Sequence, residues 1–268
     1  MQPFTQDKDL RLDIIWIGDN PESEIYVKHK KKAAESVGIS VEIHKFPETA
    51  KTEEIMLLQK ELNQDDIVTG YFIQLPIPEQ IDKNRLFRKI DPVKDVDGLN
   101  PLNLGLLWQR QEALAPATAA GIMRMIKKDV VVDLMGKNVV IVNDSIIVGR
   151  PLAALLLKDG ATVSICTKHT ENLQEYTRVA DILITATGVV GLIKGDMIKE
   201  GVVLIDVGTR RCTHVRDGKS VCKICGDVEF DSCLEKASFI TPVPGGVGPV
   251  TVAMLLANVC SAYKIQNS

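Results

Sequence analysis

The chain has 268 residues, of which 45% are hydrophobic and 4% aromatic, and its 32 Lys and Arg against 35 Asp and Glu give a net charge of −3. This length allows a large core and two domains, whereas the charge balance and the few aromatic residues exclude a broad phosphate-binding or base-stacking surface, so we expect no nucleic-acid partner. No apolar run approaches about 18 residues and no signal-peptide pattern is present, which predicts a cytoplasmic protein without a membrane partner.

Short β-branched runs alternate with helical patterns along the whole chain. The predicted strands are residues 12–18, 41–46, 67–75, 138–143, 162–166, 181–187 and 202–208. Strands separated by helices indicate βαβ units and parallel sheets. We therefore expect two three-layer α/β domains with a cleft between them, the second built on a Rossmann-type parallel sheet. The predicted boundaries are 1–117, 118–245 and a C-terminal helix, 246–268, that returns to pack on the first domain.

The helical segment 23–38 has one lysine in an unusual place. On a helical wheel the apolar side chains fall on one arc, which is made of Tyr26, Val27, Ala33, Ala34 and Val37. Lys30 lies inside this arc, whereas Lys28, Lys31 and Lys32 lie on the polar side with Glu35. Two interpretations remain open. Lys30 either extends past the apolar arc to water, or it is buried because it has a partner or a chemical task.

The turn after the strand at 138–143 resembles a nucleotide-binding turn only in part. Gly149 and Arg150 lead into a helix with Pro151 in its first turn, and a helix N-terminus can bind a pyrophosphate through its N–H groups. The G-x-G-x-x-G pattern is nevertheless absent, because Asn143 and Ser145 stand where glycines would be needed. The motif alone fits a dinucleotide site and an ordinary βα turn equally well.

A cluster of cysteines follows the last predicted strand. Cys212, His214, Cys222 and Cys225 have spacings that could close a tetrahedral zinc site, with the turn "VRDGK" as the tip of a hairpin. The alternative is a pair of strands flanked by reduced cysteines. The six cysteines of the chain are too clustered for the disulfide framework of a small secreted domain.

Residues 240–259, "ITPVPGGVGPVTVAMLLANV", place prolines and glycines densely before an apolar helix, which indicates a rigid loop that presents backbone to a flat ligand. With this segment the chain resembles the methylenetetrahydrofolate dehydrogenase/cyclohydrolase family. Seven segments occur in the family's order, namely "SEIYVKHKKKA", "GYFIQLPIP", "DPVKDVDGLNPLNLG", "IVGRP", "GDMIKEGVVLIDVG", "GDVEF" and "ITPVPGGVGPVT".

The resemblance implies a role for each matching residue. Tyr26, Lys30 and Gln74 would be catalytic: Tyr26 stacks on the folate, Lys30 is the acid/base group one helical turn away, and Gln74 hydrogen-bonds and tunes that lysine. Asp97 would read the pterin edge. The folate cleft would also be lined by Leu75, Pro242, Gly245 and Gly246, with partly cis-proline geometry. By their local sequence alone, structural roles are favoured: Asp97 would cap a turn and Gln74 would serve a strand-end backbone.

The resemblance also implies a nicotinamide cofactor. Its site would comprise Asn143, Asp144, Ser145, Gly149, Arg150, Lys168, Thr187, Gly188 and Thr209. No carboxylate ends the strand at 162–166, where an NAD-preferring site would carry one. Lys168 and Arg150 favour the 2′-phosphate of NADP, whereas Asp144 opposes it, so we expect NADP, with NAD as the alternative.

The expected function is that of a bifunctional folate enzyme. It would oxidise methylene-tetrahydrofolate with NADP and hydrolyse methenyl- to formyl-tetrahydrofolate, as a homodimer joined through the cofactor domain. A monofunctional NAD-dependent methylenetetrahydrofolate dehydrogenase and a catalytically silent folate- or nucleotide-binding protein are the alternatives. No metal is expected apart from the open question of the cysteine cluster.

Overall fold

The computed structural model describes residues 9–130, 132–216 and 219–268, which form two compact units. The first unit comprises Met1–Ala117 and Val252–Ser268, and the second comprises Thr118–Thr251. The main sheet of each unit is parallel, which confirms the predicted class of two α/β domains. The last helix, α9 (Val247–Gln266), begins in the second unit and ends in the first.

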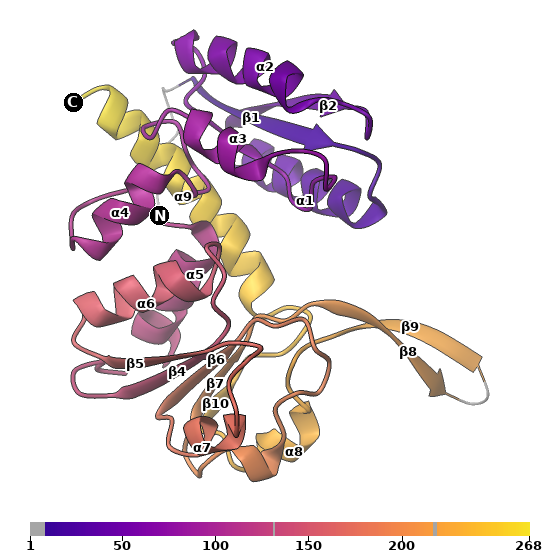
Figure 1. Cartoon of the computed structure of the whole chain (residues 1–268), viewed down its shortest axis with the longest axis vertical. Coiled ribbons are helices and arrows are strands. Elements are labelled where there is room, and N and C mark those ends of the chain that lie inside the picture. Colours follow the sequence, from indigo (N-terminus) through magenta and orange to yellow (C-terminus); the bar gives the residue numbers. More distant parts are fainter. Residues whose placement is uncertain (1–8, 131, 217–218) are drawn as a thin grey trace. The chain divides into compact units, whose positions relative to one another are not determined.

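The first unit is a three-stranded sheet between layers of helices (Figure 1). Its strands are β1 (Leu10–Ile17), β2 (Ile39–Phe46) and β3 (Gly70–Ile73), in the order β2-β1-β3. Its helices, besides α9, are α1 (Pro21–Ser36), α2 (Thr52–Gln64), α3 (Lys83–Lys89) and α4 (Pro101–Trp108). Because side chains alternate along a strand, Leu12, Ile14 and Trp16 of β1 share one face, where they pack in a core with α1 and α9.

The second unit holds the Rossmann-type sheet, in the order β10-β7-β6-β4-β5. The strands are β4 (Asn138–Val142), β5 (Thr162–Cys166), β6 (Ile182–Thr185), β7 (Val203–Asp206) and β10 (Phe239–Ile240). The helical segments are α5 (Ala117–Met125), a π-helical turn (Ile126–Val130), α6 (Gly149–Lys158), α7 (Leu173–Thr177), a 3-10 turn (Gly195–Met197) and α8 (Phe230–Leu234). From β4 the chain passes to β5 on one side and later to β6 on the other, so the loops that follow β4 and β6 diverge at a topological switch point.

The predicted hairpin is present and extends away from the second sheet (Figure 1). It consists of β8 (Arg210–Arg216) and β9 (Lys219–Cys225), which pair antiparallel; the tip of the predicted turn at 217–218 lies outside the described residues.

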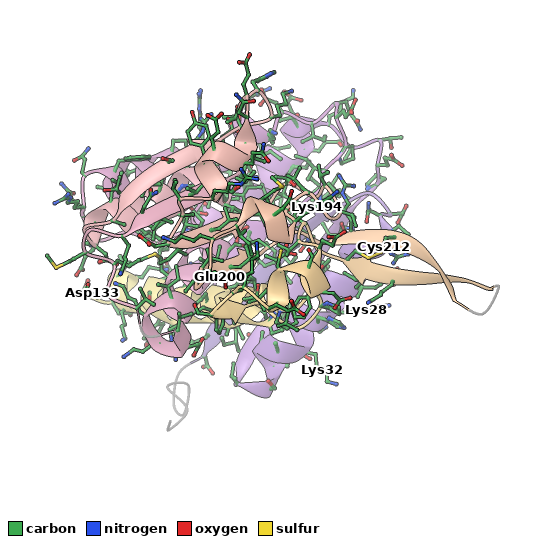
Figure 2. The ribbon with its side chains drawn as sticks, turned by 90° about the horizontal axis from the view of Figure 1, so that it is seen from below. Lys28, Lys32, Asp133, Lys194, Glu200 and Cys212 are labelled. Atoms are coloured by element: carbon green, nitrogen blue, oxygen red, sulfur yellow. A yellow bond between two sulfur atoms is a disulfide. The ribbon has the colours of Figure 1, made fainter. Side chains whose placement is uncertain are left out.

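Both interpretations of the cysteine cluster need correction, because the Sγ atoms of Cys212 and Cys225 form a disulfide near the base of this hairpin (Figure 2). Bonded to each other, these sulfurs are not thiolate ligands, and they are not the reduced cysteines of the alternative interpretation. The side chains of His214 and Cys222 lie outside the described residues. Among the residues that the structure describes, no group of three or more His, Cys, Asp or Glu could hold a metal ion.

Helix α9 corrects a second expectation. Within the described ranges it is the one helix long and apolar enough to cross a membrane by length and composition, with a mean hydropathy of 1.2, although the sequence analysis found no such run. The core helix of a folded domain meets the same criteria, and Leu255, Val259 and Ala262 of α9 are buried in the core of the first unit. The length of this helix is therefore weak support for a membrane role.

Candidate functional site

Lys30 is turned into the first unit. It lies three residues after Val27 and four residues before Ala34, so it shares a helix face with these two buried residues of α1. The Lys30 Nζ atom donates a hydrogen bond to Gln74 Oε1 at 3.0 Å and lies 4.2 Å from the centre of the Phe72 ring. This geometry contradicts the interpretation in which Lys30 extends to water.

The other lysines of α1 are ordinary surface residues. Lys28 and Lys32 point away from the helix (Figure 2), and Lys28 Nζ lies 2.6 Å from Glu24 Oε1. Lys31 Nζ lies 3.7 Å from Glu35 Oε1, again one helical turn away. The predicted division of this lysine run is therefore confirmed.

The side chain of Gln74 is held in one orientation. It is 6% exposed, and its Nε2 atom donates to the carbonyl oxygen of Leu75 at 2.6 Å while Oε1 accepts from Lys30. The amide therefore presents only an acceptor to the lysine. Phe72 lies two residues earlier and so shares the face of Gln74; the sequence analysis missed this ring, although the period of two along the strand would have found it.

Burial shifts the titration of both charged groups at this site. It lowers the pKa of Lys30, and the charge of Asp97 opposes that shift. It raises the pKa of Asp97 to about 6, against the effect of Lys30 and with a further contribution from Asp95. A lysine that releases its proton more easily and a carboxyl group that titrates near neutral pH are typical of a site of proton transfer.

The turn that carries Asp97 is fixed by the buried residue Asp95. One oxygen of its carboxylate accepts hydrogen bonds from the Asn100 backbone N–H at 2.7 Å and from Asn103 Nδ2 at 2.9 Å. Burial raises the pKa of this group, and these donors oppose the shift. Its other oxygen, Asp95 Oδ1, is buried without a hydrogen-bond partner.

A second clamp on this turn comes from α9. Asn258 Nδ2 donates to the carbonyl oxygens of Val96 and Ala115, each at 2.8 Å. Gly98 has φ +70°, and a Cβ atom there would lie 2.4 Å from the carbonyl carbon of Ala115, so no other residue fits. The sequence analysis missed Asp95 and Asn258, because nothing in their local sequence shows which distant backbone they bind.

The remaining residues predicted to bind folate are divided between the units. Tyr26 stands one turn before Lys30 and is 41% exposed, so its ring is accessible. Cis peptide bonds precede Pro76 and Pro244, in line with the geometry implied for the loop before α9. Pro242, Gly245 and Gly246 belong to the second unit, so their place beside Lys30 stays a prediction.

The turn after β4 is built by side chains instead of glycines. Asn143 Oδ1 accepts from the backbone N–H groups of Ser145 and Gly149, at 2.9 and 3.1 Å, and Asn143 Nδ2 donates to the carbonyl oxygen of Ala186 at 2.7 Å. The last contact joins the loops after β4 and β6. A Cβ atom on Gly149 would overlap the carbonyl oxygen of Asn143, so the glycine is required there.

The nine residues predicted to bind the cofactor all lie after the carboxyl ends of β4, β5, β6 and β7. Arg150 Nε donates to the carbonyl oxygen of Asp144 at 2.8 Å, and its Nη2 lies 3.8 Å from the Asp144 carboxylate. Lys168 is exposed in the loop after β5. This edge of a parallel sheet, at its switch point, is where open α/β folds bind ligands.

Buried Asp227 fixes the loop after β6 and is a residue that the sequence analysis did not single out. Its Oδ2 atom accepts from Thr185 Oγ1 at 2.8 Å and from Thr187 Oγ1 at 2.9 Å. Its N–H group donates to Asp206, a buried carboxyl group whose pKa is raised to about 6, mainly by burial. The segment "GDVEF" could have directed attention to Asp227, but it carries no sign of these partners.

Two models of known protein families together match almost the whole chain. The family model "Tetrahydrofolate dehydrogenase/cyclohydrolase, catalytic domain" matches residues 2–97, and the model of the NAD(P)-binding domain of the same enzymes matches residues 116–267. The chain is 49% identical to the bifunctional protein FolD of Lactobacillus helveticus over 254 residues, which are 95% of this chain and 87% of that protein.

Two solved structures are similar in fold and sequence. The bifunctional FolD methylenetetrahydrofolate dehydrogenase/cyclohydrolase of Campylobacter jejuni has a TM-score of 0.89 and 45% identity, over 96% of this chain and 89% of that one. The Trypanosoma brucei FolD, complexed with NADP cofactor and inhibitor, has a TM-score of 0.89 and 36% identity, over 96% of this chain and 87% of that one.

Proposed function

Because the chain belongs to the tetrahydrofolate dehydrogenase/cyclohydrolase family, we propose that Lys30, Gln74 and Asp97 form its catalytic and folate-binding site. The protein is a bifunctional enzyme that oxidises methylene-tetrahydrofolate to methenyl-tetrahydrofolate and hydrolyses this product to formyl-tetrahydrofolate. The observation that carries the site assignment is the 3.0 Å hydrogen bond between Lys30 Nζ and Gln74 Oε1, made over the Phe72 ring.

The two reactions place different demands on this site. Oxidation needs the folate to be aligned, because the neighbouring nitrogen lone pairs stabilise the cationic product. Hydrolysis needs protons to move as water adds and the ring opens, and a lysine with a lowered pKa suits that task. Lys30 therefore acts mainly in the second reaction. Asp97 accepts the pterin N–H groups in both reactions, and the exposed Tyr26 ring stacks on the folate.

The carboxyl edge of the second sheet suits a dinucleotide. The contact between Asn143 and Ala186 holds the switch-point loops together, and Gly149 lets the backbone of Asn143 lie against the start of α6. Bound NADP supplies the hydride acceptor. Lys168 is the cation that favours its 2′-phosphate, because Arg150 is already paired with Asp144.

The remaining assignments rest on the family resemblance. Residues 1–117 bind folate, residues 118–245 bind the cofactor, and the helix at 246–268 returns to the first domain. The protein works in the cytoplasm as a homodimer joined through the cofactor domain, without a nucleic-acid or membrane partner.

The test is the absorbance band of methenyl-tetrahydrofolate. The purified protein should produce this band from methylene-tetrahydrofolate when NADP is added, and it should remove the band from methenyl-tetrahydrofolate without any cofactor. Formation without removal would indicate a monofunctional dehydrogenase. Neither change, with folate still bound, would indicate a silent binding protein.

A further inference from the structure

The N-terminus of α6 has already used the groups that a dinucleotide-binding turn offers to phosphate. The backbone N–H of Val148 donates to Ser145 Oγ at 3.1 Å, that of Gly149 donates to Asn143 Oδ1, and that of Arg150 donates to the carbonyl oxygen of Ser145 at 3.0 Å. Pro151 has no N–H group. In a glycine-led turn such N–H groups bind the diphosphate. In this turn those N–H groups are occupied, so the negative charge of a bound diphosphate needs another partner.

Arg150, the nearest cation in sequence, does not supply a free charge. Its guanidinium is held by Asp144, through the carbonyl oxygen at 2.8 Å and the carboxylate at 3.8 Å. A carboxylate beside it reduces the attraction that Arg150 exerts on an anion. The turn after β4 thus carries a guanidinium and its counterion together.

Arg210, at the start of β8, is placed differently. Its Nε atom donates to the carbonyl oxygen of Gly188 at 3.1 Å. Among the residues that the structure describes, no carboxylate lies within ion-pair distance of Arg210. Gly188 allows this approach, because a Cβ atom at this position would lie only 3.0 Å from Arg210 Nε. The backbone of Gly188 also has φ +70°, which favours glycine. The contact anchors the guanidinium over the loop after β6 and leaves its two terminal nitrogens for a ligand.

A short series of contacts leads from Arg210 back to the switch point. Gly188 lies two residues after Ala186 in the same loop. The carbonyl oxygen of Ala186 accepts a hydrogen bond from Asn143 Nδ2 at 2.7 Å. The anchored guanidinium and the turn after β4 are therefore fixed to the same loop. We propose that Arg210 binds the diphosphate of the dinucleotide cofactor, in place of the N–H groups that Asn143 and Ser145 have occupied.

The sheet order separates this role from that of Lys168. Lys168 follows β5, and β5 and β6 lie on opposite sides of β4. The end of the second Rossmann strand, here β5, meets the ribose that carries the 2′-phosphate. Arg210 is anchored on the β6 side, so it contacts a group that NAD and NADP share. This inference rests on the proposed cofactor site at this edge.

The test is calorimetric titration of the full chain with NADP, NAD and ADP-ribose, which share the diphosphate. Arg210→Gln keeps an amide that can donate to Gly188 but lacks the charged fork. We expect this substitution to lower the affinity for all three ligands by a common factor of about ten to a hundred. Arg210→Lys should lose less, because it keeps the charge. The affinity of Arg210→Gln should also respond less steeply to added salt than that of the unchanged protein.

Arg178→Gln is the matched control. Arg178 is exposed in the same unit, and its Nε donates to the carbonyl oxygen of Asp196 at 3.0 Å, but it precedes β6 at the amino end of the sheet. The Arg178→Gln substitution should leave the affinities for NADP, NAD and ADP-ribose unchanged.

Three results would overturn the inference. They are an Arg210→Gln affinity within about twofold of the unchanged protein, an equal loss in the control, or a loss confined to NADP, which would place Arg210 at the 2′-phosphate. Failure of the unchanged protein to bind any of the three ligands would instead refute the proposed cofactor site.

Discussion

Replacing Lys30 by methionine removes the ammonium group and keeps an unbranched side chain with a similar apolar stem. The acid/base group of hydrolysis is then absent, and such groups contribute about a hundred- to ten-thousandfold to a rate. We expect the cyclohydrolase kcat to fall by a factor in this range. The dehydrogenase rate should fall less, because alignment of the folate matters more than proton transfer in that step.

The fold should tolerate the Lys30→Met change. The variant loses the contact with the Phe72 ring, worth about 0.5–2 kcal/mol, and leaves Gln74 Oε1 without its donor, which costs about 1–3 kcal/mol. In return it no longer buries an amine, whose desolvation already lowers the pKa of Lys30. These opposing effects should change the free energy of unfolding by less than about 2 kcal/mol.

The assay follows the methenyl-tetrahydrofolate band in both directions, together with thermal unfolding of each variant. Lys32→Met is the matched control, since it makes the same substitution on the outward side of α1 (Figure 2). It should retain both activities. Full cyclohydrolase activity in Lys30→Met would refute the assignment of the acid/base role.

Three further outcomes are expected. Asp97→Asn should weaken folate binding by up to about a hundredfold and reduce both activities, because charge-assisted bonds to the pterin are lost; loss of one activity alone would contradict a shared pterin anchor. Folate affinity, titrated between pH 5 and 8, should fall as the pH drops through about 6, where Asp97 with its raised pKa takes up a proton; Asp97→Asn should remove this inflection. Lys168→Ala should lower the kcat/KM for NADP relative to NAD, and an NAD-preferring protein unchanged by it would show that Asp144 governs the choice.

Much of the fold could be predicted because strands and helices are local patterns. All seven predicted strands have counterparts in β1 to β7, since runs such as "NVVIVN" and "VVLIDVG" are largely buried in a parallel sheet. The two-residue strand β10, Phe239–Ile240, was missed because so short a run has no period of its own. Helical spacing placed Lys30 among apolar residues, but the identity of its partners depends on β3, more than 40 residues further along the chain.

Long-range partners account for what the sequence analysis could not find. Asn143 and Ser145 were interpreted as a loss of the glycine turn, whereas their side chains build that turn through hydrogen bonds. The hairpin was predicted from its turn residues, but the disulfide depends on a register that places the Cα atoms of Cys212 and Cys225 6.1 Å apart. Local composition does not specify either arrangement.

The first unit is discontinuous, and this affects the order in which the protein can be completed during synthesis. Val96 and Ala115 emerge from the ribosome long before Asn258, whose side chain binds the carbonyl oxygens of both. The second unit is one continuous stretch, Thr118–Thr251, so it can finish folding while the first still lacks the end of α9. A nascent chain should therefore acquire a complete dinucleotide-binding unit first, and the turn that carries Asp97 should become rigid only after Asn258 of α9 has been synthesised.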